Sequence, residues 1–471
     1  MTHPAPHIGG VNRPMMSLIC PLVPMTHPAP HTNPHLPVPP IRRFTRPLAR
    51  FLRIESASGF VLLVCTVVAI VLANTDAAGA YHAFWHTPVH LQIGPFRLGG
   101  ELGHFFVNDV LMTAFFFFVG LEIKRELVAG ELRDARKAAL PIAAALGGML
   151  VPAGLYMALQ ANHFGEPAFR GWGVPMATDI AFVVGIMAVL GKRVPFGLKI
   201  MLLSLAIADD IGAVVVIAAF YSTGLDGFML LLAAAGFALV RILNAVGVRS
   251  VPVYAMAGAF IWLAVYKSGV HPTVAGVMLG LLAPSGVWIG RTALRLSVAD
   301  LTARLDDDDD DPDAGELEMM AFAAKESVSP LERLEHRLHP WVGFAIMPLF
   351  ALANAGVHIE LQAVTEPVSV AVAAALFLGK PAGVVLFSFV AVKFGVAKLP
   401  QGVSWLMLLG GGFLAGIGFT MSLFVAGLAF AGEPRLLADA KIGILLGSVL
   451  SAGVGAGLLV FALRKSPERG A

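Results

Sequence analysis

The segment Leu205-Ala-Ile-Ala-Asp-Asp-Ile-Gly-Ala-Val-Val-Val-Ile-Ala218 carries two adjacent carboxylates, Asp209 and Asp210, inside an apolar run that extends from Leu198 to Tyr221. About 20 apolar residues in a helix cross a hydrocarbon core about 30 Å thick, so this run is long enough to span a membrane. At about 1.5 Å of rise per residue, Asp209 lies about 15 Å along the helix from Lys199, close to the bilayer midplane. The run therefore predicts a membrane-spanning helix with two charged groups at its centre.

The composition of the whole chain is that of a membrane protein. Its 471 residues are 57% hydrophobic and 14% charged, whereas soluble proteins are about 25% charged. The mean hydropathy is +0.77. A formal net charge of +2 excludes a strongly basic nucleic-acid-binding protein. The two cysteines, Cys20 and Cys65, offer neither a disulfide framework nor the spacing of metal ligands, so we expect no bound cofactor.

Apolar runs along the chain predict an all-α integral membrane protein with about 12 transmembrane helices. The connections between most of these runs are short. The predicted spans cover approximately Ala57–Thr75, Gly103–Leu121, Ala138–Gln160, Val174–Leu190, Leu198–Tyr221, Gly227–Leu243, Val251–Tyr266, His271–Ala283, Trp341–Gly356, Val368–Val392, Trp405–Phe430 and Ile442–Leu463.

The basic residues predict how these spans are oriented, because Lys and Arg accumulate in cytoplasmic loops. With both termini in the cytoplasm, five basic residues face outward, Lys380 lies deep within a span, and the other 27 of the 33 are cytoplasmic. The opposite orientation inverts this ratio, so we expect both termini in the cytoplasm. The five outward residues are Arg97, Arg170, Lys267, Arg435 and Lys441.

Two segments fall outside this membrane plan. Residues 1–45 are rich in Pro and His, and their first heptapeptide, MTHPAPH, recurs at Met25–His31, which indicates a disordered extension; a His-rich metal-binding tail is the alternative. Residues 46–465 form the predicted membrane domain, and residues 466–471 a cytoplasmic tail. Within the domain, residues 286–339 include six consecutive Asp, 306–311. Because like charges repel and stay solvated, we expect a disordered cytoplasmic loop there.

Charged residues at depth in the membrane are the strongest functional signal. Asp179 lies in the fourth predicted span, and Lys380 is the only charge in the tenth. Each such charge costs about 3 kcal/mol on insertion scales. A buried ion pair is the structural alternative, but one amine neutralises only one of the three carboxylates. The excess negative charge favours a cation or proton site, and adjacent carboxylates such as Asp209 and Asp210 resist being ionised together.

Backbone-breaking residues mark where further oxygen ligands become available. The fourth span opens with Gly171-Trp-Gly-Val-Pro-Met-Ala-Thr-Asp179, and the eleventh contains Gly410-Gly-Gly-Phe-Leu-Ala-Gly-Ile-Gly-Phe-Thr420. Such interrupted runs in the two halves of a chain are typical of transporters whose broken helices cross at the substrate site. Close packing between helices is the alternative explanation for these glycines. A hard monovalent cation takes oxygen ligands, which Thr178 and freed carbonyls would supply together with Asp209 and Asp210.

In these residues and in further motifs, the chain resembles the NhaA family of sodium/proton antiporters, whose inverted-repeat fold has two broken crossing helices. The resemblance covers roughly residues 45 to 465. The motifs, in order, are GLEIKREL (Gly120–Leu127), PMATDIAFVVGI (Pro175–Ile186), LAIADDIGAVVVIA (Leu205–Ala218), SGVHPTVAGV (Ser268–Val277), LEHRLHPWV (Leu334–Val342), PLFALANAGV (Pro348–Val357), LGKP (Leu378–Pro381) and GIGFTMSLF (Gly416–Phe424).

The resemblance implies a multi-pass homodimer in the lipid of the bacterial inner membrane, which exchanges cytoplasmic Na⁺ or Li⁺ for external protons. It makes Asp209 and Asp210 the ion and proton carriers, with Thr178 as a further Na⁺ ligand. It also places Thr178 and Asp179 at the break of the fourth helix, and Lys380 close to the carboxylates.

The same resemblance assigns activation by alkaline pH to a cytoplasmic funnel. An ordinary surface pair is the alternative for Glu122 and Arg125, and His271 is interpreted as a packing or interface residue rather than as a proton carrier. The long N-terminal extension and the Asp-rich insert depart from the family pattern, and the insert lies beside the funnel segment. The funnel residues are Glu122, Arg125, Glu335, His336 and His339.

Two other classes of membrane protein also place carboxylates in the bilayer. An intramembrane aspartyl protease needs them on separate helices in YD and GxGD contexts, and neither context occurs here. A passive cation channel, with Asp209 and Asp210 as a pore-lining ring, is the stronger rival. The sequence therefore predicts a non-enzymatic, electrogenic and pH-regulated Na⁺(Li⁺)/H⁺ antiporter that works by alternating access, and leaves the channel as the alternative.

Overall fold

The computed structural model describes residues 55–94, 96–222, 224–248, 250–305 and 313–465. The N-terminal extension with its repeat, the Asp306–Asp311 block and the C-terminal tail therefore lie outside the described residues. The described part belongs to one compact unit that starts at Arg50.

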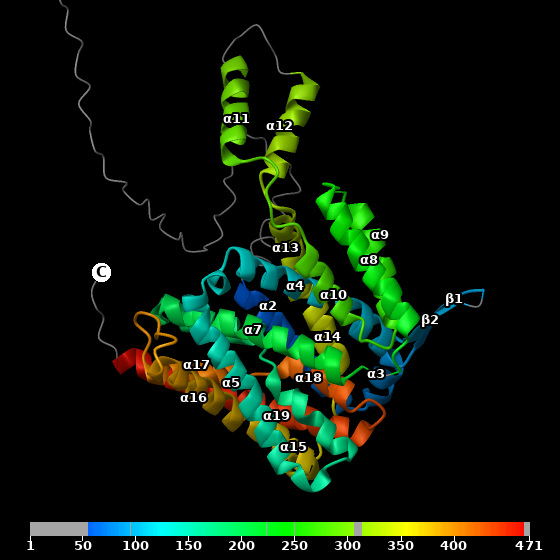
Figure 1. Ribbon diagram of the computed structural model, residues 1–471. Helices are drawn as coiled ribbons and strands as arrows, with labels where there is room; N and C mark the ends of the chain where they lie inside the picture. The colour runs from blue at the N-terminus through cyan, green and yellow to red at the C-terminus, as the bar shows by residue number, and fades with distance from the viewer. Residues whose placement is uncertain (1–54, 95, 223, 249, 306–312, 466–471) are drawn as a thin grey trace, which may run out of the picture. The chain divides into compact units, whose positions relative to one another are not determined.

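Helices make up almost all of the described structure (Figure 1). Several of the long runs change locally to 3₁₀ or π geometry. The elements are α2 (Glu55–Ala73), α3 (Ala78–Trp85), β1 (Pro88–Ile93), β2 (Phe96–Glu101), η1 (Leu102–Leu111), α4 (Met112–Val128), η2 (Glu131–Arg133), α5 (Ala135–Leu159), η3 (Ala161–His163), η4 (Pro167–Met176), α6 (Ile180–Leu190), η5 (Gly191–Arg193), α7 (Phe196–Phe220), α8 (Gly227–Ala245), α9 (Val251–Lys267), α10 (Thr273–Leu282), α11 (Arg291–Leu305), α12 (Ala314–Glu326), α13 (Pro330–Trp341), η6 (Val342–Ile346), α14 (Met347–Asn354), η7 (Gln362–Thr365), α15 (Pro367–Ala374), η8 (Ala375–Gly379), α16 (Lys380–Lys393), α17 (Trp405–Ala415), α18 (Phe419–Ala429) and α19 (Pro434–Lys465).

The predicted membrane spans are confirmed as helices. Among the described residues, seven helices are long and apolar enough to cross a membrane, and nine if each of two bent pairs counts as one span. The bent pairs are α2 with α3, at 116°, and α17 with α18, at 46°. The shorter apolar helices α9 and α10 fall in the seventh and eighth predicted spans, and η6 with α14 falls in the ninth.

Glycines allow two pairs of helices to touch through their backbones. A Cβ on Gly147 of α5 would lie 2.1 Å from the carbonyl oxygen of Gly383 in α16, and one on Gly383 would lie 2.0 Å from the oxygen of Gly147. On α10, a Cβ on Gly280 would lie 2.5 Å from the oxygen of Phe117 in α4. Close approach between small residues is the main way that helices associate in lipid. These contacts fix α16, which begins with Lys380, against α5.

The structure differs from the sequence prediction in three places. Strands β1 and β2 form an antiparallel hairpin, from the Pro88–Glu101 pair to the Ile93–Phe96 pair, where no strand was predicted. The expectation of a disordered loop over 286–339 is wrong where α11, α12 and α13 form, and α11 packs beside α12 (Figure 1). Helix α19 begins at Pro434 rather than near Ile442.

Apolar contacts explain why the third of these helices, α13, is ordered. Leu331 of α13 is buried, at 2% exposure, and clusters with Leu121 of α4 and with Ala283 just after α10. The Ser329 hydroxyl accepts a hydrogen bond of 3.2 Å from the backbone N–H of Glu332 and so caps the helix. Helix α13 is thereby held against the end of α4.

Candidate ion-binding site at two broken helices

Two interrupted helices meet in the interior of the bundle. Helix η4 ends at Met176 and α6 begins at Ile180, with extended backbone between them. Helix α17 ends at Ala415 and α18 begins at Phe419. The backbone N–H of Asp179 donates to the carbonyl of Ile417 at 2.7 Å, so the two breaks are in direct contact.

Asp179 accepts hydrogen bonds from the backbone N–H groups that the two breaks leave exposed at the starts of α6 and α18. Its Oδ1 accepts from the backbone N–H groups of Ala181 at 3.1 Å and Phe182 at 3.4 Å, at the start of α6. Its Oδ2 accepts from the backbone N–H of Thr420 at 3.0 Å and from the Thr420 hydroxyl at 2.5 Å, at the start of α18. A carboxylate is favourable at the positive N-terminal end of a helix, and this one serves two such ends. The geometry makes Asp179 a group that holds the crossing together.

Lys380 and Asp209 form a fully buried ion pair. Lys380 Nζ lies 2.7 Å from Asp209 Oδ2, and both side chains are 0% exposed. The ammonium also donates to the carbonyl of Met176, at the C-terminal end of η4, where a positive charge is favourable. The stem of Lys380 passes close to Gly148, where a Cβ would lie 3.5 Å from the lysine Cε. Lys380 therefore compensates both a carboxylate and a helix end.

The hydroxyl of Thr178 connects the break to the same carboxylate. Thr178 Oγ1 lies 2.6 Å from Asp209 Oδ2 and 3.0 Å from the carbonyl oxygen of Ala415. A hydroxyl has one proton, so it donates to only one of these acceptors at a time. Its lone pairs remain available to a cation.

The carboxylate of Asp210 takes part in none of the contacts described above. It is 2% exposed, and its Oδ1 has no hydrogen-bond partner among the described residues; the same is true of Asp209 Oδ1. Glu122 of α4 is close enough to Asp210 to act on it by charge repulsion. Buried polar oxygens are rarely left unpaired, and two unpaired oxygens on adjacent carboxylates are open to a proton or a cation. Because Lys380 pairs with Asp209 alone, the adjacent carboxylates Asp209 and Asp210 form an oxygen-lined site suited to a hard cation or protons.

The structure also brings two of the predicted funnel residues, Arg125 and Glu335, into contact. Arg125 of α4 pairs with Glu335 of α13, and the ring of His339 lies 5.8 Å from that of Phe118. Burial raises the pKa of Glu335 above its ordinary value, while the positive charge of Arg125 opposes that rise. Glu122 and His336 lie on the same two helices.

Three contacts at the crossing were not predicted from the sequence. They are the Thr420 hydroxyl on Asp179, the Met176 carbonyl on Lys380, and the passage of the Lys380 stem along Gly148. Thr420 is the last residue of the Gly-rich segment that predicted the second break. Its position was therefore noted, but its hydrogen bond to Asp179 was not predicted.

A bundle of membrane spans with a buried, ion-paired carboxylate cluster at two broken helices defines a membrane ion transporter rather than an enzyme. The profile of the family described as Na⁺/H⁺ antiporter 1 matches residues 49–459. The chain is 48% identical over 433 residues to the Na(+)/H(+) antiporter NhaA of Rhodopirellula baltica, covering 91% of this chain and 97% of that protein. It is also 48% identical to the Na(+)/H(+) antiporter NhaA of Rhizobium meliloti, covering 92% and 98%. The chain therefore belongs to the NhaA family of sodium/proton antiporters and is a multi-pass membrane protein.

Among solved structures, that of the sodium proton antiporter MjNhaP1 from Methanocaldococcus jannaschii at pH 8 is 15% identical to this chain, with a TM-score of 0.45 and coverage of 90% of this chain and 95% of that one.

Proposed function

We propose that this protein is an electrogenic, pH-regulated antiporter that expels cytoplasmic Na⁺ or Li⁺ in exchange for external protons by alternating access. The observation that carries the proposal is the pair of buried oxygens, Asp209 Oδ1 and Asp210 Oδ1, which have no partner among the described residues. They lie on one turn of α7, beside the crossing of two broken helices. The antiporter names of the relatives support the choice of ions.

The ion pair suggests how proton loss is coupled to cation binding. With the site open to the cytoplasm, Asp210 gives up its proton and, together with Asp209 and the Thr178 hydroxyl, presents oxygen ligands to Na⁺. The cation then competes with Lys380 for the Asp209 carboxylate, 2.7 Å from the ammonium. Weakening that pair favours release of a proton from Lys380. With the site open to the outside, protons return and displace Na⁺. Two protons for one monovalent cation move net charge.

The Arg125–Glu335 pair is the proposed origin of the pH dependence. Because burial raises the pKa of Glu335, the carboxyl is protonated at higher pH than an exposed glutamate. At low pH, neutral Glu335 does not hold Arg125; as pH rises, the ionised carboxylate draws α13 to α4 through this pair. Activation with rising pH therefore follows from ionisation of Glu335, with His336 and His339 on the same helix as further titratable groups.

The orientation and assembly also belong to the proposal. The protein lies in a bacterial inner membrane. Both of its termini are on the cytoplasmic side, as the distribution of Lys and Arg predicts. The end of the bundle that carries α13 is then cytoplasmic, and the end that carries the β1–β2 hairpin faces outward. Lipid surrounds the apolar faces, and the family resemblance supports a homodimer. Nucleic acid is not a partner.

Purified protein in proteoliposomes tests the function. A pH indicator inside the vesicles should respond when Na⁺ or Li⁺ is added, should not respond to K⁺, and should need no other protein. The response should grow when the membrane potential favours net charge movement in the transport direction. Dissipation of a Na⁺ gradient without any counter-movement of protons would instead identify a passive cation channel.

A further inference from the structure

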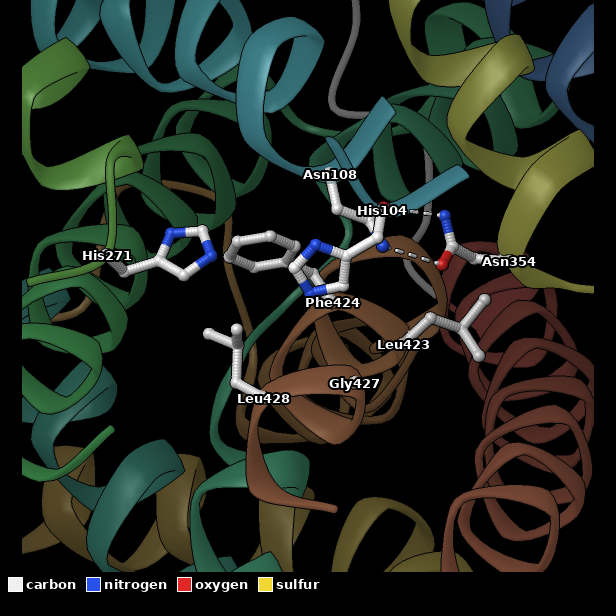
Figure 2. Close-up of a pocket in the computed structure, with 8 residues that line it drawn as sticks. All are labelled: His104, Asn108, His271, Asn354, Leu423, Phe424, Gly427 and Leu428. Atoms are coloured by element: carbon white, nitrogen blue, oxygen red, sulfur yellow. Dashed lines mark hydrogen bonds between the residues drawn. The ribbon is translucent and has the colours of Figure 1, made fainter. Parts of the chain in front are cut away.

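A second polar cluster lies at the outward end of the bundle, away from the Lys380–Asp209 pair. Helix η1 leads directly from strand β2 into α4 and contributes two of the polar side chains. Figure 2 shows the pocket, in which the amides of Asn108 and Asn354 are joined by hydrogen bonds of 2.9 and 3.3 Å. It is lined by His104, Asn108, His271, Asn354, Leu423, Phe424, Gly427 and Leu428.

A buried carboxylate beside this pocket stands between two histidines. Asp109 Oδ2 lies 3.6 Å from Nδ1 of His104, and Asp109 Oδ1 lies 3.7 Å from Nε2 of His271. The side chain of His104 is 68% exposed, whereas those of Asp109 and His271 are 5% and 10% exposed. The three groups thus run from the protein surface to its interior, at separations slightly longer than a direct hydrogen bond.

The two histidines differ in what they can do. Nδ1 of His271 lies 2.8 Å from the hydroxyl oxygen of Thr273 and 3.4 Å from its backbone nitrogen; when these groups donate to Nδ1, the proton of the neutral ring is on Nε2, which faces Asp109. His271 is thereby held as a donor toward the carboxylate. His104 is exposed, and its Nδ1 faces the same carboxylate, so it is the member that exchanges protons with the outer solution.

Other charged groups around the cluster are few and of mixed sign. Glu101 of β2 acts on His104, and Tyr266 of α9 is close enough to Asp109 to be affected by its charge. Lys267 lies 5.5 Å from the centre of the Tyr266 ring. Helices α14 and α18 line the pocket with Asn354 and with Gly and apolar residues, so within the described residues they add no titratable group to its lining.

Helix α18 links this pocket to the ion site. Thr420, which bonds Asp179, and Phe424, which lines the pocket, are four residues apart and therefore about one helical turn apart. The Phe424 ring packs edge-on against His271 at 5.3 Å and lies 5.4 Å from the ring of Phe116, which is fully buried. The Phe424 ring therefore connects the pocket lining to the buried core.

We propose that this cluster is the external proton-acceptor site of the transporter: His104 takes a proton from the outer solution and passes it to Asp109. The inference rests on the proposed exchange of Na⁺ for protons. Each step transfers one proton between named groups, from hydronium or buffer to the His104 imidazole and from there to the Asp109 carboxylate. Its consequence is that the cluster sets how transport depends on outer pH.

The test uses the full-length protein in proteoliposomes, with the pH on the α13 side held fixed and the pH on the hairpin side varied. His104→Gln and Asp109→Asn should each raise the outer proton concentration for half-maximal Na⁺ transport by about three- to tenfold, since a proton relay loses one carrier. The cytoplasmic Na⁺ concentration for half-maximal rate should stay at the parent value. His163→Gln is the matched control, because His163 is a partly exposed histidine in the connection between α5 and η4, paired with Glu166 at 2.8 Å, and is not part of the pocket lining.

An unchanged outer-pH dependence in His104→Gln overturns the proposal, and so does an equal shift in His163→Gln. Because His104 is exposed, its variant decides the matter even where Asp109→Asn fails to fold. Failure of the underlying function is a different result: the parent protein itself then shows no Na⁺-dependent proton movement in the same vesicles.

Discussion

Replacing Gly147 by Ala tests whether backbone contact between α5 and α16 positions the ion-paired lysine. The new Cβ would lie 2.1 Å from the carbonyl oxygen of Gly383, whereas close C···O contacts are about 3.3 Å, so the two helices must separate by about 1 Å. Overpacking of this kind costs about 1–3 kcal/mol. Lys380 precedes Gly383 by three residues, so the shift carries its ammonium away from Asp209, 2.7 Å distant in the native structure.

We therefore expect Gly147→Ala to lower the thermal stability of detergent-purified protein and to slow Na⁺/H⁺ exchange by about 10- to 100-fold, the cost of a displacement of about 1 Å at a reacting centre. Gly154→Ala is the matched control in the same helix, because a Cβ there meets nothing within 4 Å. It should be neutral or stabilise the helix by up to about 1 kcal/mol. Equal stability and activity of the two variants would refute the reasoning.

Three further predictions concern the site, its regulation and the N-terminal extension. Thr178→Val removes the hydroxyl 2.6 Å from Asp209, so the Na⁺ concentration for half-maximal exchange should rise about three- to tenfold, one weak oxygen ligand being lost; an unchanged concentration would show that Thr178 does not bind the ion. Glu335→Gln cannot ionise and mimics the acid form, so the part of the activation that follows Glu335 is lost; half-activation should move to higher pH, where the remaining groups of α13 set it, while the maximal rate is spared. An unchanged pH profile removes α13 from the regulation. Deleting residues 1–40 should leave exchange intact, because they lack the apolar content to pack; lost transport in protein that still inserts and purifies would show that they take part.

The membrane spans and the carboxylates were predictable because both depend on local sequence. Apolar runs of about 20 residues have few alternatives to a membrane helix, and charges inside them stand out because they are costly. Asp209, Asp210 and Lys380 were found in this way. Gly and Pro in the fourth and eleventh spans marked the breaks, since both residues weaken continuous helix.

Contacts between distant segments were harder to predict. Arg125 and Glu335 are separated by 210 positions, and their own helices give no sign of the pairing. Thr420 stands in an apolar, Gly-rich run where a threonine has no distinct pattern, yet it bonds Asp179. In the loop 286–339 the Asp block outweighed the apolar residues of its helices, and the contact of Leu331 with Leu121 became visible only in three dimensions.

The most direct measurement of the two-carboxylate mechanism is Na⁺-induced proton release and exchange by purified Asp210→Asn. The amide keeps the size of the side chain but removes the charge and the titration, so Na⁺ loses a ligand and the proton its carrier. An uncharged group is cheaper to bury, by about 1–3 kcal/mol on insertion scales, so the variant should be at least as heat-stable as the parent. We predict well-folded protein with no measurable exchange and no Na⁺-induced proton release; electrogenic exchange retained by this variant would contradict the mechanism.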